Sequence, residues 1–338
     1  MEHLLLLILD SKTPKTRLEI DEVIMECNPN SNSLKMILTI CCFSRFLMTA
    51  QSATADFGLT IDRAVRVQFS TTPGKFFQIQ SSPNVEPPVW TAVAPVVAGD
   101  GNPHDAGFLI DNSVQSLYRV QEFDLTTGLV AFYPFNGNSD DTSGSGNNGT
   151  VNGATLTTNR FGVANSAYSF NGTNSYISIP DSTVFESKDF SISLWFQAFQ
   201  LPVIADNARQ VEFLISKGQN NFEIHLGSAL TGATAIRFLP RGVTLWDTPP
   251  DTYQTNVWEH AVAVFAPSRK DVHFYLNGRP LNIQGPDLQF VGADNSIPAR
   301  LGMRTDGTLP FWGNLDDVRI YNRGLSKAEV NSLFNLVE

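Results

Sequence analysis

The clearest sequence pattern is a succession of short segments in which apolar and polar residues alternate, with turns rich in Gly, Asn, Asp and Pro between them. Residues 190–196 (FSISLWF) show it well, because Phe, Ile, Leu and Phe stand at every second position. Alternation of this kind is typical of a strand with one buried face. Many short strands separated by turn signals predict an antiparallel β protein.

Charge and cysteine content exclude several classes of function. The formal net charge is -10 and only 17% of residues are charged, with no cluster of Lys and Arg after residue 55. An acidic body of this kind argues against binding to nucleic acid or to anionic membranes. The 3 cysteines (Cys27, Cys41 and Cys42) all precede residue 56. The remainder of the chain therefore has no disulfide and no thiolate metal site.

The first 55 residues resemble a leader. Residues 36–43 (MILTICCF) form an apolar run, and Ala53 and Ala55 provide the small side chains that signal peptidase requires. We expect a signal peptide over about residues 36–55, cleavage after Ala55 and a secreted or cell-surface protein. Met36 is an alternative start. The run is too short for a membrane span, which takes about 20 residues.

Residues 56–123 are expected to form a small β-sandwich module. This region resembles the fibronectin-type-III-like modules that precede binding domains in bacterial secreted proteins, and such a module would serve as a spacer. Residues 124–128 (DLTTG) are the expected linker. The alternating segments of the module are residues 64–69, 77–80, 90–97, 108–110 and 116–120.

From residue 128 onward the motifs are more specific. They are residues 128–135, 136–150, 160–162, 167–172, 176–180, 190–196, 258–264, 272–278 and 311–326. In this order they resemble the laminin-G-like jelly-roll domain of the concanavalin-A-like superfamily. The resemblance implies an all-β domain over residues 129–338, in which two antiparallel sheets form a jelly-roll sandwich.

Two local signals inside this domain predict a turn and a helix. Asn277 and Gly278 suit a type I′ hairpin turn, because both central residues need positive φ. Ser326 and Glu329 form a capping box at the start of a short C-terminal helix. The helical face expected to pack on the sandwich consists of Val330, Leu333, Phe334 and Val337.

A structural calcium ion is one candidate site. Asp141 lies in a loop rich in Gly and Asn, and Ca²⁺ prefers carboxylate and carbonyl oxygens. The resemblance implies a Ca²⁺ shared by Asp141 and Asp316, with Asp140 or Asn147 as auxiliary ligands. Alternatively, Asp141 forms an Asx turn and Asp316 hydrogen-bonds local backbone.

A glycan-binding surface is a second candidate, because aromatic faces beside planar hydrogen-bonding groups suit sugar rings. The alternative is that these aromatic residues pack in the core, as is expected for Trp195 and Trp258 within strand patterns. The candidate ligand-binding residues are Trp246, Asp247, Asp251, Tyr253 and Trp312.

Catalysis is not expected. Glycosidases of the resembling superfamily carry a Glu-x-Asp-x-Glu run on one strand, and this chain has none. Asp316 and Asp317 are adjacent, so in a regular strand they would point to opposite faces. His260 and His273 are expected to be partly buried strand residues. The 5 histidines are scattered at His3, His104, His225, His260 and His273.

Together these patterns favour a secreted, non-catalytic binding module that recognises a glycan or a surface or matrix protein through jelly-roll loops. A divergent glycoside hydrolase or lyase is one alternative, and a structural building block of the cell surface is another. Neither a nucleic-acid partner nor a membrane span is expected.

Overall fold

The alternating segments form strands in the computed structural model, which describes residues 63–83, 89–110, 117–205, 208–218, 221–228, 231–240, 246–283 and 296–336. The expected signal peptide and its cleavage after Ala55 lie outside these residues. One compact unit holds the described residues up to Leu125 together with Asn335 and Leu336, and Thr126–Phe334 form the other. The linker predicted over residues 124–128 and the domain predicted over residues 129–338 stay predictions.

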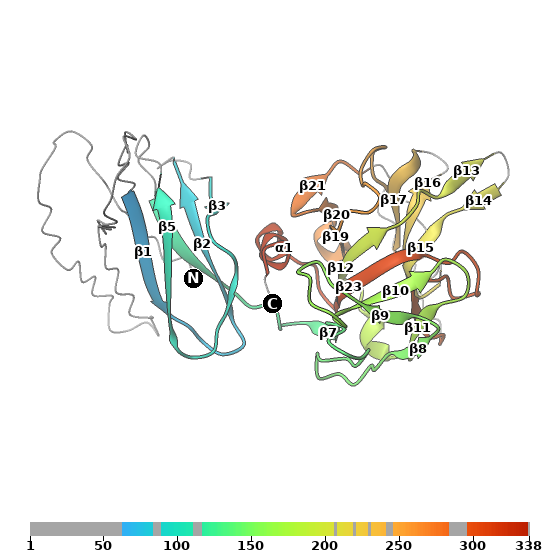
Figure 1. Ribbon diagram of the computed structural model, residues 1–338, viewed down its shortest axis with the longest axis horizontal. Helices are drawn as coiled ribbons and strands as arrows, with labels where there is room; N and C mark the ends of the chain where they lie inside the picture. Colours follow the sequence, from blue (N-terminus) through green and yellow to red (C-terminus); the bar gives the residue numbers. More distant parts are fainter. Residues whose placement is uncertain are drawn as a thin grey trace, which may run out of the picture. The chain divides into compact units, whose positions relative to one another are not determined.

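The first unit contains two small antiparallel sheets (Figure 1). The side chains of Val67 and Phe69 pack with Phe77, Ile79 and Tyr118 to form its core. The fibronectin-type-III-like identity of this unit stays a prediction. Its strands are β1 (Arg63–Ser70), β2 (Phe76–Ser82), β3 (Thr91–Ala92), β4 (Val97–Ala98), β5 (Pro103–Ile110) and β6 (Leu117–Phe123).

The second unit is a sandwich of two antiparallel sheets, which confirms the predicted all-β jelly-roll class (Figure 1). The first sheet is 8-stranded and has the order β21-β20-β19-β12-β23-β10-β9, with β7 also paired to β23. Its strands are β7 (Leu129–Tyr133), β9 (Thr155–Thr157), β10 (Ala167–Asn171), β12 (Phe190–Ala198), β19 (Glu259–Ala266), β20 (Asp271–Leu276), β21 (Arg279–Leu281) and β23 (Trp312–Tyr321).

The second sheet is 7-stranded and has the order β18-β17-β16-β15-β22-β11-β8. A separate hairpin pairs β13 (Val203–Ala205) with β14 (Ala208–Gln210). Two short 3-10 helices, η1 (Thr183–Glu186) and η2 (Pro267–Arg269), lie in connections. The strands of the second sheet are β8 (Thr150–Asn152), β11 (Tyr176–Ile179), β15 (Glu212–Ser216), β16 (Phe222–Ser228), β17 (Gly232–Pro240), β18 (Trp246–Asp247) and β22 (Ala299–Leu301).

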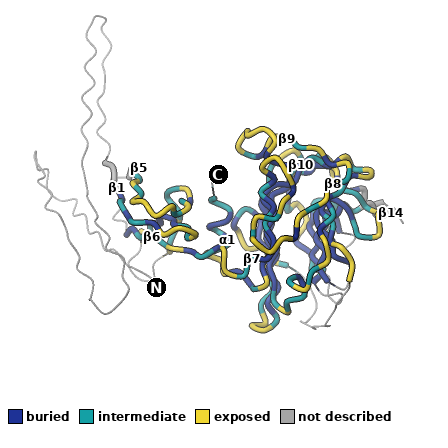
Figure 2. Tube along the Cα trace, turned by 90° about the horizontal axis from the view of Figure 1, so that it is seen from below, coloured by how far each residue is buried: buried dark blue, intermediate teal, exposed yellow. Residues whose placement is uncertain are grey.

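The core lies between these two sheets, as the alternation predicts. On β12 the side chains of Ile192, Leu194 and Phe196 point inward and are fully buried. Ser191 and Ser193 point to the outer face of the same strand and are buried as well. Figure 2 shows that buried residues are concentrated in the strands and exposed residues in the loops. Central strands of the first sheet are therefore covered on both faces.

The predicted turn and helix are both present. Asn277 and Gly278 have φ of 50° and 73°, and they join β20 to β21. Helix α1 (Lys327–Phe334) begins after Ser326, whose hydroxyl and N–H contact the Glu329 carboxylate at 2.8 and 2.7 Å. Of the predicted helical face, Val330 and Leu333 are buried and the Phe334 ring stacks on Trp195, whereas Val337 lies outside the described residues.

The prediction that Asp316 and Asp317 point to opposite faces is wrong. The pairing of β12 with β23 shifts register between Ser193 and Trp195, and Asp317 has φ of 48°. A bulge inserts an extra residue and re-aims the side chain at that point. Both carboxylates consequently reach one guanidinium, since Arg160 lies 2.6 Å from Asp316 and 2.7 Å from Asp317.

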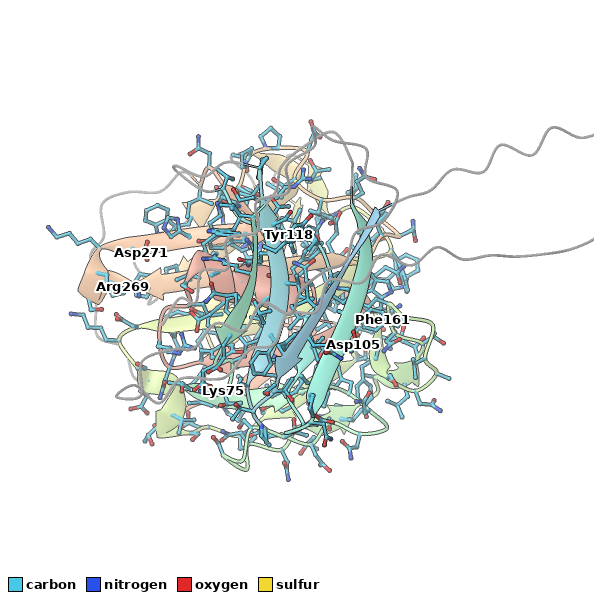
Figure 3. All side chains as sticks on the ribbon, turned by 90° about the vertical axis from the view of Figure 1, so that its left-hand side faces the viewer. Lys75, Asp105, Tyr118, Phe161, Arg269 and Asp271 are labelled. Carbon is cyan, nitrogen blue, oxygen red and sulfur yellow. The ribbon has the colours of Figure 1, made fainter. Side chains whose placement is uncertain are left out.

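Connections at the edge of the first sheet carry exposed charges. Arg269 in η2 and Asp271 at the start of β20 form an ion pair at 3.3 Å, and Figure 3 shows them close together at one end of these strands. His273 is also exposed, contrary to its expected partial burial, and it contacts Asp271 at 2.5 Å. His273 lies on β20 just before the residues that pair with the short β21. Whether an outward side chain is buried depends on what covers that face of the sheet, which alternation alone does not show.

Candidate functional site

Trp312 is the predicted aromatic ligand residue that the structure leaves most open to solvent. It begins β23, and its side chain is on the outer face of the sheet because Leu315 on the same strand points into the core. The residue is 43% exposed. Its ring meets the Phe199 ring edge-on, with 6.3 Å between centroids. Positive φ (70°) at Gly172 and the missing Cβ there allow the backbone to pass close to the indole.

Amide side chains lie beside Trp312 on the same outer face. Asn314, two residues along β23, donates to Gln197 Oε1 at 2.9 Å, and Asn314 Oδ1 has no partner among the described residues. Asn171 is the cross-strand neighbour of Trp312 on β10. An indole face bordered by amide donors and acceptors can contact both the C–H groups and the hydroxyls of a sugar ring.

A buried carboxylate anchors the Trp312 backbone. Glu212 Oε2 accepts from the Trp312 N–H at 3.0 Å, and its Oε1 accepts from Gln200 at 2.8 Å. Burial raises the pKa of Glu212, while the hydrogen bonds from Trp312 and Gln200 act in the opposite direction. Because both oxygens are engaged by the protein, Glu212 positions the strand end and is not a free acceptor for a ligand.

The other four predicted ligand residues are not gathered around Trp312. Tyr253 is in the core, where its hydroxyl donates to Ala233 O at 3.1 Å. Trp246 packs against the core, and Asp247 forms a buried ion pair with Arg237 at 2.6 Å. Only Asp251 is exposed, in a turn where its N–H donates to Thr234 Oγ1. Core packing thus accounts for the aromatic residues of this loop.

The predicted calcium ligands also have protein partners. Asp141 accepts from the backbone N–H groups of Phe132, Ser143 and Asn147, each at 2.9 Å. Asp316 pairs with Arg160, a cation that competes with any metal ion at that carboxylate. The Asn147 amide donates to Val130 O. Asp140 is exposed, and its backbone N–H donates to Asn138 Oδ1. Within the described ranges no group of three or more His, Cys, Asp or Glu is placed to hold a metal ion.

These contacts correspond to the turn and backbone roles considered as the alternative for Asp141, and to an ion pair for Asp316. A calcium ion shared by Asp141 and Asp316 stays a prediction. The donor set of these residues does not favour it, because a Ca²⁺ site needs six to eight oxygens and these carboxylate oxygens already accept hydrogen bonds or pair with a guanidinium.

A second polar cluster, on the outer face of the other sheet, was not anticipated from sequence. Arg300 on β22 lies over the Tyr176 ring, 4.4 Å from its centroid. Arg304 contacts Glu223 at 3.4 Å and Asp306 at 3.0 Å. Alternation in residues 176–180 shows which side of β11 faces outward, but only strand pairing places Tyr176 beside Arg300.

Comparison with known families gives a match for most of the sandwich. Residues 171–331 match the family model described as the concanavalin A-like lectin/glucanases superfamily. Over these residues the sandwich is therefore similar to a concanavalin A-like domain. The strands β7 to β10 precede this match but belong to the same two sheets, since β7 pairs with β23 and β8 with β11.

Other proteins resemble parts of this chain. A segment of 136 residues is 24% identical to the adhesion G-protein coupled receptor V1 of Danio rerio, covering 36% of this chain and 2% of the receptor. Domain 4 of AbnA, a GH43 extracellular arabinanase from Geobacillus stearothermophilus solved with arabinotriose, is 25% identical with a TM-score of 0.46. That match covers 61% of this chain and 97% of the other.

The binding domain of Paraclostridial Mosquitocidal Protein 1 is 23% identical, with a TM-score of 0.47 over 61% of this chain and 52% of that one. None of the helices in the described part of this chain is long and apolar enough to cross a membrane. The sandwich combines a match to this superfamily with an exposed indole at Trp312.

Proposed function

We propose that the sandwich is a non-catalytic carbohydrate-binding module of a secreted or cell-surface protein, and that it holds a sugar ring against Trp312. The observation that carries this proposal is the exposed indole, 43% open to solvent at the end of a central strand. A large aromatic side chain that stays in solvent lacks the stabilisation that burial provides, and a ligand stacked on its ring would provide it.

The surroundings of Trp312 fit a neutral sugar. Of the amides on this face, Asn314 Oδ1 is a buried acceptor without a partner among the described residues. The Gln197 amide already bonds to Asn256 O and Asn314, and the Asn171 amide bonds within the turn at residues 173–175, so a sugar would share or exchange these bonds. Hydroxyl groups match amides as donors and acceptors, whereas a sulfated glycan would need cations.

The test is a glycan array followed by calorimetry on the array-positive oligosaccharide, with the full chain. We expect Trp312→Ala to weaken binding by at least about tenfold, which corresponds to about 1.4 kcal/mol. Phe161→Ala is the matched control, because Phe161 is an equally exposed aromatic residue at 43% (Figure 3). Equal loss in both variants, or unchanged binding in Trp312→Ala, would remove the proposed role of Trp312.

A protein ligand is the second candidate, because two aliphatic side chains are exposed near the same strand end. Leu201 follows Phe199 by two residues, and Val257 follows Asn256, whose N–H donates to Ala198 O at 2.7 Å. Both are 43% exposed. The double variant Leu201→Ser with Val257→Ser distinguishes the two kinds of ligand. It should leave sugar binding at Trp312 unchanged, whereas it should weaken binding of a protein through an apolar contact.

A further inference from the structure

Arg300 lies at the centre of a second candidate site, on the other sheet of the sandwich from Trp312. Arg300 lies on the outer face of β22, because Ala299 and Leu301 on either side of it point into the core. Its strand neighbours are Ser178 on β11 and Ser216 on β15, both uncharged. The cation therefore stands near the middle of a sheet face, between two hydroxyl side chains.

Neutral groups hold the Arg300 guanidinium in place. It lies 4.4 Å from the centroid of the Tyr176 ring, and its Nη1 donates to the backbone oxygen of Arg304 at 3.3 Å. The sulfur of Met303 is 3.8 Å from the same Nη1. Because one edge of the guanidinium makes all these contacts, Nε and Nη2 remain as donors without an acceptor among the described residues.

Carboxylates near Arg300 are engaged elsewhere. Glu223 accepts from Ser216 at 2.8 Å and pairs with Arg304, and Asp306 pairs with Arg304 at 3.0 Å. In the described ranges no Asp or Glu forms an ion pair with Arg300. A half-buried cation without a counter-ion is only partly solvated, so an anion from outside would stabilise it.

The chemistry of the donors indicates which anion. A single guanidinium presents a planar pair of N–H groups that matches a carboxylate in a bidentate arrangement. The adjacent Arg304 is already neutralised by two acids, so the local charge suits one negative charge rather than a polyanion. Ser178 and Tyr176 are half-buried residues, and their hydroxyl groups can hydrogen-bond to those of a sugar.

We propose that Arg300, with Tyr176 and Ser178, forms a binding site for the carboxylate of an acidic sugar on the outer face of the second sheet. This site is independent of Trp312, which belongs to the other sheet of the sandwich. The chain would thereby hold neutral and acidic residues of a glycan on different faces.

The experiment follows the Arg Nε–H signals in ¹H–¹⁵N spectra of the ¹⁵N-labelled full chain, with the Arg300 signal identified by its loss in Arg300→Lys. Glucuronate is the main titrant, and glucose, acetate and inorganic phosphate are the comparison titrants. We expect a saturable shift of the Arg300 signal with glucuronate, at a midpoint about tenfold lower than with acetate, and no shift with glucose. Tyr176→Phe should raise the glucuronate midpoint severalfold while retaining the ring.

Several outcomes would overturn the proposal. If glucuronate does not shift the Arg300 signal, the proposed site does not exist. If acetate and glucuronate give equal midpoints, the site binds a carboxylate but does not recognise the sugar ring. A tighter response to phosphate than to glucuronate assigns a phosphate ligand instead. Arg279, exposed on β21, provides the internal control because its signal should not move. Trp312→Ala should leave the Arg300 response unchanged. A failure of the proposed Arg300 site can therefore be distinguished from a failure of the proposed function at Trp312.

Discussion

At the scale of single residues, Arg160 shows how a loop is secured to the outer face of the first sheet. Its guanidinium contacts Asp316 and Asp317, whose side chains are 0% and 1% exposed. The same group lies 4.2 Å from the Phe161 ring centroid and 4.5 Å from that of Trp195. Both buried carboxylates lose part of their compensation for lost hydration without this cation, although Asp317 also pairs with Arg319 at 3.1 Å.

Replacing this cation should destabilise the domain strongly. We expect Arg160→Met to lower the free energy of unfolding by about 3–5 kcal/mol, the range for breaking a buried ion pair. Urea denaturation at pH 7 provides the measurement. Adding Asp316→Asn and Asp317→Asn to the same chain should restore part of the loss. Arg279→Met on the exposed edge should stay within about 0.5 kcal/mol, and an equal loss there would contradict this account.

Buried His260 makes stability depend on pH. Burial, together with the cations of Arg319 and Arg160, lowers the pKa of His260 to about 3. The folded state holds His260 neutral while the unfolded chain takes up a proton below about pH 6.5, so stability falls as pH falls from 6.5 toward 3. Each pH unit in this window costs about 1.4 kcal/mol for this histidine.

The matching measurement is denaturant unfolding of His260→Gln and of the original chain at pH 7 and pH 5. We expect the variant to lose less stability between these values, since its amide takes up no proton. Burial also lowers the pKa of His225, to about 4, so His260→Gln should retain part of the pH dependence. Identical slopes in the two proteins would contradict the assignment to His260.

At the scale of elements, the loop after β22 joins the two sheets through a close packing contact. Gly302 has φ of 79°, and a Cβ at this position would overlap the ring of Phe170 on β10. The Gly302 carbonyl accepts from Phe311 N–H at 2.9 Å, and the Phe311 ring lies 6.1 Å from that of Phe170. Glycine is therefore required here for both its backbone conformation and its lack of a side chain.

Gly302→Ala separates these two requirements when it is compared with Gly137→Ala. Gly137 has a similar φ of 85° but no atom within 4 Å of an added Cβ. Both variants lose about 1 kcal/mol or more from positive φ, and Gly302→Ala should lose a further 1–3 kcal/mol, approximately, from overpacking. Thermal unfolding of both variants gives the difference. Equal losses would show that the Phe170 contact is relieved by small shifts.

At the scale of the whole molecule, the sandwich Thr126–Phe334 contains the large core, all strands of both its sheets and α1. The first unit has a smaller core of its own, around Phe69, Phe77 and Ile79. A domain of about 200 residues buries roughly 70% of the surface of its unfolded chain. The sandwich therefore has enough buried surface to fold without its neighbour.

We expect the isolated fragment Thr126–Phe334 to unfold cooperatively, with the same midpoint as the main transition of the full chain. Differential scanning calorimetry of both proteins makes the comparison. The full chain should show an additional, smaller transition from the first unit. A fragment without a cooperative transition would place the domain boundary elsewhere, and a midpoint lowered by many degrees would show that residues 335–338 or the first unit stabilise the sandwich.

The sequence by itself determined the all-β class, several of the strands, the Asn277–Gly278 turn and the capping box of α1, because these features depend on local alternation and local φ preferences. It did not predict β15, β16, β17 or β22. Tertiary structure decided which aromatic residues stay in solvent. Trp246 and Tyr253 share a polar stretch with Asp251, yet both pack against the core, while Trp312 remains exposed. The exposure of a single residue depends on which distant segments cover that face of the sheet, and local alternation does not contain this information.

The same reason explains the sites that sequence reasoning missed or misplaced. Asp316 and Asp317 converge on Arg160 through a bulge, and the partner lies 156 positions away in the chain. Arg300 reaches Tyr176 only because β22 pairs with β11. Sequence periodicity determines which face of a strand a side chain occupies, whereas strand order and register determine its neighbours, and these are set by the packing of the whole sandwich.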